Sequence, residues 1–551
     1  MSDTTLASTE GLLSIEGLTV ALPKGADRPH ALEDVSLRLA PNEILCVVGE
    51  SGSGKSLTAG AVMRLLPEGV RATAGRILFE GRDLLALPPA EMRRLRGARI
   101  GMVFQEPMTA LNPLRSIGSQ IAEMFRIHTR LSGAEIDRRV LALLGDVRIP
   151  DPAAAARAYP HELSGGQRQR AMIAMALALE PKLLICDEPT TALDVTTQAQ
   201  ILHLIREMQR RTGTAVLFIT HDFGVVADIA DRVAVMRRGL LVEQGPAEAV
   251  LNRPQHPYTR ALVAAVPPLA PPPAQPLSAE VVLEIDHVSK TYRKGGWLKR
   301  NRRVTHAVKD VSLSLPRGGT LGIVGESGSG KSTLARCIVR LLDPDQGEIR
   351  LEGQDRLALS REELRKAAPQ VQMVFQDPFA SLNPRRRVGE LVAQGPIIHG
   401  TPKAEAQARA RELFELVGLD PSALDRFPHE FSGGQRQRIG LARALAMRPR
   451  VLVADEPVSA LDVSVQAQVL KLLARLRAQL GLSIVFITHD LRVAAQLCDH
   501  VAVMRERVVV ESGTVAEVFA RPSHDYTRAL MAAIPGQGWT PPVAFGSEEP
   551  V

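Results

Sequence analysis

Two copies of one glycine-rich string hold the residues best suited to bind phosphate. Gly-Glu-Ser-Gly-Ser-Gly-Lys-Ser spans residues 49–56 and recurs at residues 325–332. Its glycines let successive backbone N–H groups curl around phosphate oxygens, and the helix expected after the string points its positive dipole end at them. In the first copy, Lys55 then supplies a charge for the β- and γ-phosphates, and the Ser56 hydroxyl can ligate Mg²⁺. Because the whole string occurs twice, we predict two nucleoside-triphosphate sites rather than a pair of tight turns.

An acidic pair follows a short apolar run in each copy, at Asp187-Glu188 and at Asp455-Glu456. An aspartate at the carboxyl end of a buried parallel strand lies beside the phosphate loop, where it can hold a water ligand of the metal. The adjacent glutamate can polarise an attacking water. Since both pairs end apolar runs, we prefer this interpretation to one of exposed surface acids.

These side chains need strands and helices that bring them to one edge of a sheet. Residues 44–48, 183–186 and 216–219 are short, continuously apolar runs of the buried parallel-strand type. Between Gln105 and Ser164 the periodicity becomes helical, which predicts an inserted helical subdomain. The chain is 45% hydrophobic and only 3% aromatic. Its cores must therefore be mostly aliphatic, as in parallel α/β sheets.

The repeat extends over both halves of the chain, since Ser-Gly-Gly-Gln-Arg-Gln-Arg also occurs at residues 164–170 and 432–438. A chain of 551 residues exceeds what one core usually serves. Each copy is also far longer than a solenoid repeat of about 20–45 residues. We therefore predict duplicated domains. The expected parts are a flexible N-terminus (1–11), a first domain (12–266), a proline-rich linker (267–279), a second domain (280–535) and a flexible tail (536–551).

The strings Leu-Ser-Gly-Gly-Gln at residues 163–167 and Phe-Ser-Gly-Gly-Gln at residues 431–435 resemble the signature of the ATP-binding cassette (ABC) superfamily. The resemblance covers both copies nearly end to end. It implies an α/β protein with two tandem P-loop domains, each with a RecA-like parallel sheet, an antiparallel β subdomain and a helical subdomain. In that family two cassettes stack head to tail, and each signature completes the other cassette's ATP site. The implied activity is ATP hydrolysis, with ATP and Mg²⁺ as cofactors.

The resemblance also implies roles for individual residues. The implied catalytic residues are the glutamates Glu188 and Glu456 and the γ-phosphate switches His221 and His489. The implied metal-site residues are Ser56, Gln105, Asp187, Ser332, Gln376 and Asp455. The implied nucleotide contacts are these metal-site residues, Tyr292, the first loop (Gly49, Glu50, Ser51, Gly52, Ser53, Gly54, Lys55, Ser56, Leu57), the second loop (Gly325, Glu326, Ser327, Gly328, Ser329, Gly330, Lys331, Ser332, Thr333) and the signatures (Ser164, Gly165, Gly166, Gln167, Ser432, Gly433, Gly434, Gln435).

The two copies differ at one nucleotide-binding position. Tyr292 matches the family's adenine-stacking aromatic, whereas the aligned residue of the first copy is Leu22. Loss of a stacking partner costs on the order of 1 kcal/mol. We therefore expect weaker nucleotide binding at the first site.

Further strings resemble one group within the family. Leu-Asn-Pro at residues 111–113 and 382–384, and Tyr-Thr-Arg at residues 258–260 and 526–528, look like the ATPases of bacterial dipeptide, oligopeptide and nickel importers. The fused pair resembles single-chain versions that serve peptide, microcin-like peptide or glutathione uptake. The implied partners are two membrane permease subunits and, indirectly, an extracytoplasmic solute-binding protein. The implied location is the cytoplasmic face of the inner membrane.

The Tyr-Thr-Arg segments are interpreted as structural helices packed on their own cassettes, because no chemistry converges there. Some relatives bind an iron–sulfur cluster through cysteines after this segment. This chain has no cysteine there, so we expect no cluster.

Other classes of protein stay open. A twin-cassette protein acting on ribosomes or nucleic acid is the main alternative, but the linker is short and proline-rich, and the net charge of +7 is a mild excess that does not require nucleic acid. The densest basic cluster, at residues 299–303, is interpreted as a solvated hairpin tip. An exporter is disfavoured because exporters usually carry fused membrane spans, and no apolar run approaches about 20 residues. A purely structural nucleotide-binding module is disfavoured because both glutamates are kept.

Overall fold

The computed structural model describes residues 11–190, 193–273, 276–294, 303–459 and 461–542. The chain divides into two units. The first comprises the residues up to Leu193, Thr197–Val266 and those from Pro535 onward; the second comprises Asp194–Thr196 and Pro267–Ile534. The basic cluster at residues 299–303 falls mainly in the range 295–302, outside the described residues.

The apolar runs of the first half form a six-stranded sheet in the order β10-β9-β3-β8-β7-β6. Its strands are β3 (Ile44–Val48), β6 (Ile100–Val103), β7 (Leu183–Asp187), β8 (Ala215–Ile219), β9 (Arg232–Arg237) and β10 (Leu240–Pro246). All neighbouring strands are parallel except β10, which is antiparallel to β9 at one edge. The strands β3, β7 and β8 are buried along their whole length, as expected of a parallel sheet covered by helices on both faces.

A second, antiparallel sheet of the first unit has the order β2-β1-β4-β5. Its strands are β1 (Leu13–Ala21), β2 (His30–Leu39), β4 (Arg71–Phe79) and β5 (Arg82–Asp83). Burial largely alternates along β1 and β2, because one face of this sheet packs on the core and the other lies toward solvent. The buried face shares one hydrophobic core with the parallel sheet and with α1 (Lys55–Met63).

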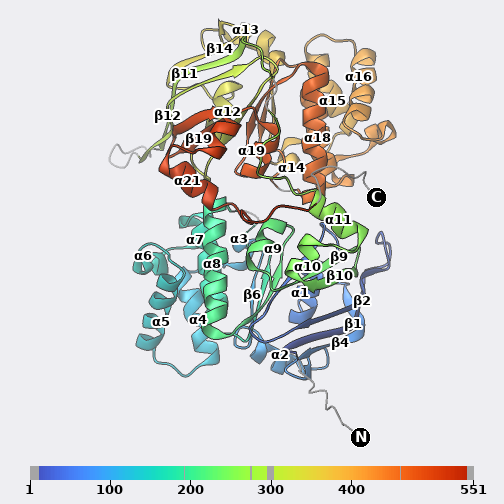
Figure 1. Ribbon diagram of the computed structural model, residues 1–551, viewed down its shortest axis with the longest axis vertical. Coiled ribbons are helices and arrows are strands. Elements are labelled where there is room, and N and C mark those ends of the chain that lie inside the picture. The colour runs from blue at the N-terminus through green and yellow to red at the C-terminus, as the bar shows by residue number, and fades with distance from the viewer. Residues whose placement is uncertain (1–10, 191–192, 274–275, 295–302, 460, 543–551) are drawn as a thin grey trace. The chain divides into compact units, whose positions relative to one another are not determined.

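The segment between β6 and β7 is helical, as the periodicity predicted. It contains α4 (Ile117–His128), α5 (Gly133–Asp146), α6 (Pro152–Arg157) and α7 (Gly165–Leu177), which contact one another. In Figure 1, α4, α5 and α6 gather on one side of the first unit, and β1, β2 and β4 lie on the other. The remaining helices are α2 (Pro89–Leu95), α3 (Pro107–Ala110), α8 (Val195–Thr212), α9 (Phe223–Ile229), α10 (Ala247–Asn252) and α11 (Pro257–Ala264).

The second unit repeats this architecture, with sheets in the orders β12-β11-β14-β15 and β16-β17-β18-β13-β19-β20. Its strands are β11 (Val281–Lys294), β12 (Arg303–Pro316), β13 (Thr320–Val324), β14 (Gln346–Leu351), β15 (Gln354–Asp355), β16 (Val371–Val374), β17 (Val451–Asp455), β18 (Ser483–Ile487), β19 (His500–Arg505) and β20 (Val508–Thr514). Its helices are α12 (Lys331–Ile338), α13 (Arg361–Ala367), α14 (Pro378–Ser381), α15 (Val388–Ile398), α16 (Lys403–Leu416), α17 (Gly433–Leu445), α18 (Val463–Leu480), α19 (Leu491–Leu497), α20 (Val515–Ala520) and α21 (Asp525–Ala532). The predicted α/β fold class, with two P-loop domains of this composition, is confirmed.

The segments that follow α11 and α21 are held by hydrogen bonds. In the second unit, the carbonyl groups of Pro268 and Ala270 both accept hydrogen bonds of 2.8 Å from Gln496 Nε2. In the first unit, Gly536 N donates to Asp228 Oδ2 and Trp539 Nε1 to Asn252 Oδ1, both at 3.0 Å. Residues 536–539, expected to belong to a flexible tail, are thus hydrogen-bonded to the first unit. The rest of the predicted tail beyond residue 542, and residues 1–10, lie outside the described residues. Within the described ranges, no helix has both the length and the apolar character needed to cross a bilayer.

Candidate nucleotide sites

The phosphate loops connect β3 to α1 in the first unit and β13 to α12 in the second. Each helix begins directly after a glycine, Gly54 or Gly330, whose φ of 107° is accessible to few other residues. A Cβ atom at Gly330 would lie 2.3 Å from the carbonyl oxygen of Ala307, so a side chain has no room there. Both loops therefore take the tight turn that directs backbone N–H groups into one concave cradle.

The lysine of each loop is buried within that cradle. Lys55 Nζ donates to the carbonyl oxygens of Gly49 and Glu50 at 2.7 and 3.0 Å. Lys331 Nζ makes the same two bonds in the second unit, both at 2.8 Å. Burial lowers the pKa of Lys331, although the neighbouring acids, Glu456 first among them, partly offset that effect. A buried ammonium so close to a row of N–H groups is suited to an anionic ligand with several oxygens.

Each loop serine lies against the strand-end aspartate. Ser56 Oγ donates to Asp187 Oδ1 at 2.9 Å, and Ser332 Oγ to Asp455 Oδ1 at 3.0 Å. Burial raises the pKa of both aspartates, and the adjacent glutamate adds to that rise, while the serine hydrogen bond opposes it. Mg²⁺ prefers hard oxygen ligands and usually combines one or two protein groups with substrate phosphates. The hydroxyl and carboxylate oxygens of these pairs fit that preference.

A second polar cluster centres on the glutamate after each aspartate. In the first unit, Gln105 Nε2 donates to Glu188 Oε2 at 3.2 Å, and His221 Nδ1 lies 3.3 Å from the same oxygen. Glu188 has a φ of 45°, which is unusual for a residue with a side chain and stores backbone strain. Such strain is typical of functional sites, where the surrounding structure holds one residue in a defined direction.

The second unit has the same cluster with nearly the same dimensions. Gln376 Nε2 donates to Glu456 Oε2 at 2.9 Å, and His489 Nδ1 lies 3.3 Å from that oxygen. Burial would raise the pKa of Glu456, but the hydrogen bond and charge of His489 outweigh it and lower the pKa. Burial would likewise lower the pKa of His489, yet Glu456 raises it. The two groups thus stabilise each other as a carboxylate and an imidazolium.

The signature strings form capped helix starts. Ser164 Oγ accepts from Gln167 N at 3.3 Å, and Gln167 Oε1 accepts from Ser164 N at 2.9 Å; Ser432 and Gln435 repeat both bonds at the same distances. These reciprocal bonds are a capping box. The serine and the glycines after it lie at the positive ends of α7 and α17, where an anion is stabilised. That each signature completes the site of the other cassette stays a prediction.

The two candidate base-stacking positions differ in their surroundings. Tyr292 lies on β11 with 39% of its surface exposed. Leu22, just after β1, packs against the hydrophobic core of the first unit. Only the second unit therefore presents an aromatic ring at this position, and its contact with a base stays a prediction.

Sequence reasoning missed one pair of residues at these sites. The hydroxyl of Tyr258 on α11 accepts a hydrogen bond from Glu50 N at 3.2 Å, and that of Tyr526 on α21 accepts from Glu326 N at 3.1 Å. The guanidinium carbons of Arg237 and Arg505 lie 4.9 Å from the centres of these two rings. The helices pack on their own units, as interpreted, but each also holds a phosphate loop. The repeated Tyr-Thr-Arg string was the available signal.

Comparisons with known proteins agree with this geometry. The ABC transporter family matches residues 32–191 and 308–459. The oligopeptide/dipeptide transporter C-terminal region matches residues 242–287 and 510–540, which include both tyrosine helices.

Curated relatives match over nearly the whole chain. The peptidoglycan transport ATP-binding protein YejF of Agrobacterium fabrum is 49% identical over 530 residues, covering 96% of this chain and 97% of the relative. The glutathione import ATP-binding protein GsiA of Salmonella choleraesuis is 47% identical over 557 residues, covering 95% of this chain and 89% of the relative. GsiA of Escherichia coli is 46% identical with the same coverage. The predicted family and ATPase activity are thereby confirmed: the chain belongs to the ABC transporter family, as an ATP-binding and ATP-hydrolysing protein with two cassettes.

Proposed function

We propose that this chain drives the import of peptides or closely related solutes through a membrane permease. The observation that carries the proposal is the complete duplication of the glutamate cluster, with Glu188 and Glu456 each held by a glutamine and a histidine. Both cassettes thus have the groups needed for hydrolysis. The oligopeptide/dipeptide transporter region and the import and transport ATPases among the relatives support the solute class.

The residues at each site have distinct proposed roles. The phosphate loop and its lysine bind and orient the triphosphate of ATP. The loop serine, the strand-end aspartate and the glutamine would hold Mg²⁺, which would supply positive charge to neutralise the phosphates. The glutamate accepts a proton from the attacking water, and its backbone strain and two partners fix its carboxylate for that task. The histidine, paired with the same carboxylate, then responds to the presence of the γ-phosphate.

The two cassettes share their sites in this proposal. The signature of each, with its serine hydroxyl and helix N-terminus, completes the site formed by the phosphate loop of the other. ATP then closes the pair and hydrolysis releases it, which supplies an alternating motion to the permease. Because Leu22 stands where the second cassette has Tyr292, the first site binds nucleotide more weakly in this proposal.

Surfaces beside the glutamine residues are suited to receive the permease. In the second unit, Gln376 lines a cavity of about 710 Å³ whose apolar lining includes Leu341 and Phe375. Leu341 is 59% exposed, and Leu114, shortly after the glutamine of the first unit, is 85% exposed. Large exposed apolar side chains are typical of interaction sites when they gather in one region. A permease segment on these residues would be linked to the glutamate clusters through Gln376 and Gln105.

The proposed partners are two permease subunits, and the solute reaches them through an extracytoplasmic binding protein. The chain then acts at the cytoplasmic face of the membrane. Neither nucleic acid nor an iron–sulfur cluster has a part in this function.

Co-purification tests the proposal. The double variant Glu188→Gln, Glu456→Gln binds ATP without hydrolysing it, and it is purified from detergent-solubilised cells with ATP present. We expect two multi-span permease subunits to accompany it, and their binding protein is then titrated with peptides, glutathione and peptidoglycan fragments. Recovery of ribosomes or nucleic acid without a membrane protein would contradict the import function and leave the ATPase activity intact.

A further inference from the structure

The second unit has a cavity at the opposite edge of its sheet from the nucleotide site. It measures about 600 Å³ and lies where parallel strands begin: Arg450 precedes β17, and Leu482 precedes β18. β17 is five residues long, which corresponds to roughly 16 Å at about 3.3 Å per residue. The glutamate cluster follows its carboxyl end, whereas the cavity lies at its amino end. The volume is in the range of small-molecule sites, about 300–1,000 Å³.

Four arginines line this cavity, and two of them are already neutralised. Arg317 pairs with Glu352 at 2.6 Å and Glu280 at 2.7 Å, and Arg450 also pairs with Glu352. The other two, Arg409 and Arg448, form no salt bridge with any described residue.

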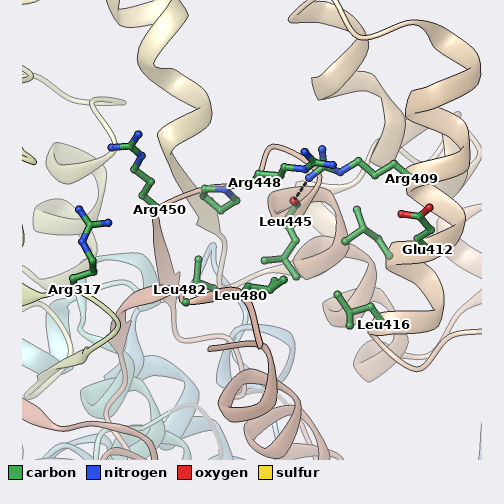
Figure 2. Close-up of a pocket in the computed structure, with 12 residues that line it drawn as sticks. Arg317, Arg409, Glu412, Leu416, Leu445, Arg448, Arg450, Leu480 and Leu482 are labelled. Atoms are coloured by element: carbon green, nitrogen blue, oxygen red, sulfur yellow. Dashed lines mark hydrogen bonds between the residues drawn. The ribbon is translucent and has the colours of Figure 1, made fainter. Parts of the chain in front are cut away.

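Arg409 and Arg448 form a cationic pair at one side of the cavity. In Figure 2, Arg409 reaches from α16 toward Arg448, which follows α17. Arg409 Nη2 donates a hydrogen bond to the carbonyl oxygen of Leu445 at 3.3 Å. Burial lowers the pKa of Arg409, the charge of Arg448 adds to the effect, and Glu412 only partly opposes it. Glu412 also lines the cavity and offsets part of the charge of Arg409, so the two guanidinium groups and this one carboxylate carry a net positive charge.

Leucine side chains form the apolar part of the lining. Leu445 and Leu482 are buried, whereas Leu480, the last residue of α18, is 52% exposed. Figure 2 shows these three leucines between the two groups of arginines, and Leu416 on the side of Arg409 and Glu412. The exposed apolar area of Leu480 is unfavourable in water, and it lies in the same cavity as Arg448, whose side chain is also exposed.

The first unit has different chemistry at the matching positions. Glu180 occupies the position of Arg448, three residues after the signature helix, and both have left-handed backbones with φ of 49° and 51°. Thr212 ends α8 where Leu480 ends α18, and its hydroxyl lies 2.8 Å from that of Thr214. The cassette fold therefore requires neither the positive charge nor the leucine.

We propose that this cavity binds a small amphiphilic anion, with a carboxylate or phosphate headgroup on Arg409 and Arg448 and an aliphatic body on Leu445, Leu480 and Leu482. Guanidinium groups match carboxylate and phosphate oxygens with paired hydrogen bonds. A wholly polar anion would leave the leucines in water, and a neutral apolar molecule would make no use of the excess positive charge. A ligand with both parts contacts the charged and the apolar side chains of the lining together.

Calorimetric titration of the intact chain with decanoate, below its micelle concentration, tests the proposal independently of ATP turnover. We expect saturable binding that Arg448→Glu weakens at least about tenfold, because the reversed charge repels the headgroup. Leu480→Thr, which installs the residue of the first unit, should weaken it roughly threefold by removing apolar contact. Arg365→Glu, the same charge change on the exposed face of α13, should leave binding unchanged.

A parallel sedimentation assay with phosphatidylglycerol vesicles distinguishes the source of the headgroup. Binding of decanoate assigns the site to a free amphiphile. Binding of vesicles alone, lost in Arg448→Glu and kept in Arg365→Glu, assigns it to a lipid headgroup. The proposal is overturned if neither probe binds saturably, or if Arg448→Glu and Leu480→Thr, shown to be folded by circular dichroism, bind decanoate as well as Arg365→Glu does.

Discussion

The phenolic oxygen of Tyr258 lies 3.2 Å from the backbone nitrogen of Glu50, so a helix near the end of the first cassette holds the second residue of its phosphate loop. Tyr526 holds Glu326 in the same way at 3.1 Å. Burial raises the pKa of both phenols, that of Tyr526 to about 12, so both stay neutral at physiological pH. The hydroxyl uses its oxygen as the acceptor, and the loop is thereby fixed before nucleotide arrives.

Removing this hydroxyl should weaken nucleotide binding. Tyr526→Phe keeps the ring on Arg505 and removes one hydrogen bond to the loop, which is worth about 1 kcal/mol or roughly fivefold in affinity. Titration with a fluorescent ATP analogue measures the change. Tyr159→Phe, at an exposed tyrosine outside the loop, is the matched control. Equal affinities of Tyr526→Phe and the control would show that the bond has no part in preorganising the loop.

Loss of each glutamate should abolish hydrolysis at its own site. Glu188→Gln and Glu456→Gln remove the proton acceptor and should lower the rate at the altered site about 10²–10⁴-fold. The amide keeps the size of the side chain, so ATP binding should persist. Phosphate release by each single variant and by the double variant is the measurement. A double variant with near wild-type turnover would exclude these residues as the bases.

The pKa of His489 should depend on Glu456. The ordinary histidine pKa of 6.5 is raised here because the carboxylate outweighs burial. Glu456→Gln removes the main raising influence and leaves burial and the charge of Lys331 opposed only by the charge of Asp490, so the pKa of His489 should fall. NMR titration of ¹³C-labelled histidine measures this change, and His489→Gln assigns the signal. Because folding raises the pKa of His489, its protonation stabilises the folded protein. This contribution to the free energy of unfolding is complete below about pH 6.5 and is lost as the pH rises through the folded-state pKa. An unchanged pKa in Glu456→Gln would contradict the pairing.

Replacing the aromatic residue at the stacking position of the second cassette should remove the difference in nucleotide affinity between the two sites. Tyr292→Leu gives the second cassette the residue type of the first and should weaken adenine nucleotide binding there by about 1 kcal/mol. The measurement is nucleotide titration of variants in which only one phosphate-loop lysine is kept. Similar affinities of the two sites in the otherwise unaltered chain would oppose this reading of Leu22.

The residues of the phosphate loop, the acidic pair and the signature were predictable because each acts through local backbone geometry. Gly54 must take a left-handed turn wherever the helix begins, and Ser164 caps the helix that follows it. Asp187 was placed near Ser56 because a strand end and a loop meet at one edge of a parallel sheet. The structure confirms that the two are in contact.

Other relationships depended on contacts between residues far apart in the chain. Tyr258 and Glu50 are separated by 208 positions, and no periodicity indicates which side chain reaches that amide. Residues 536–539 were expected to belong to a flexible tail because the segment after Pro535 contains Gly, Pro and two Glu. Hydrogen bonds from Gly536 N to Asp228 and from the Trp539 indole to Asn252 hold them.

The sequence by itself determined that the chain has two ATP-binding cassettes, because repeated strings of fixed spacing build each site from a few adjacent residues. Only the tertiary structure showed which distant helix holds each phosphate loop. It alone also brought Arg409 and Arg448 together above the leucines of one cassette and not the other. The reason is physical: a local turn is set by its own φ and ψ angles, whereas the pairing of charges and the shape of a cavity depend on how helices and strands pack.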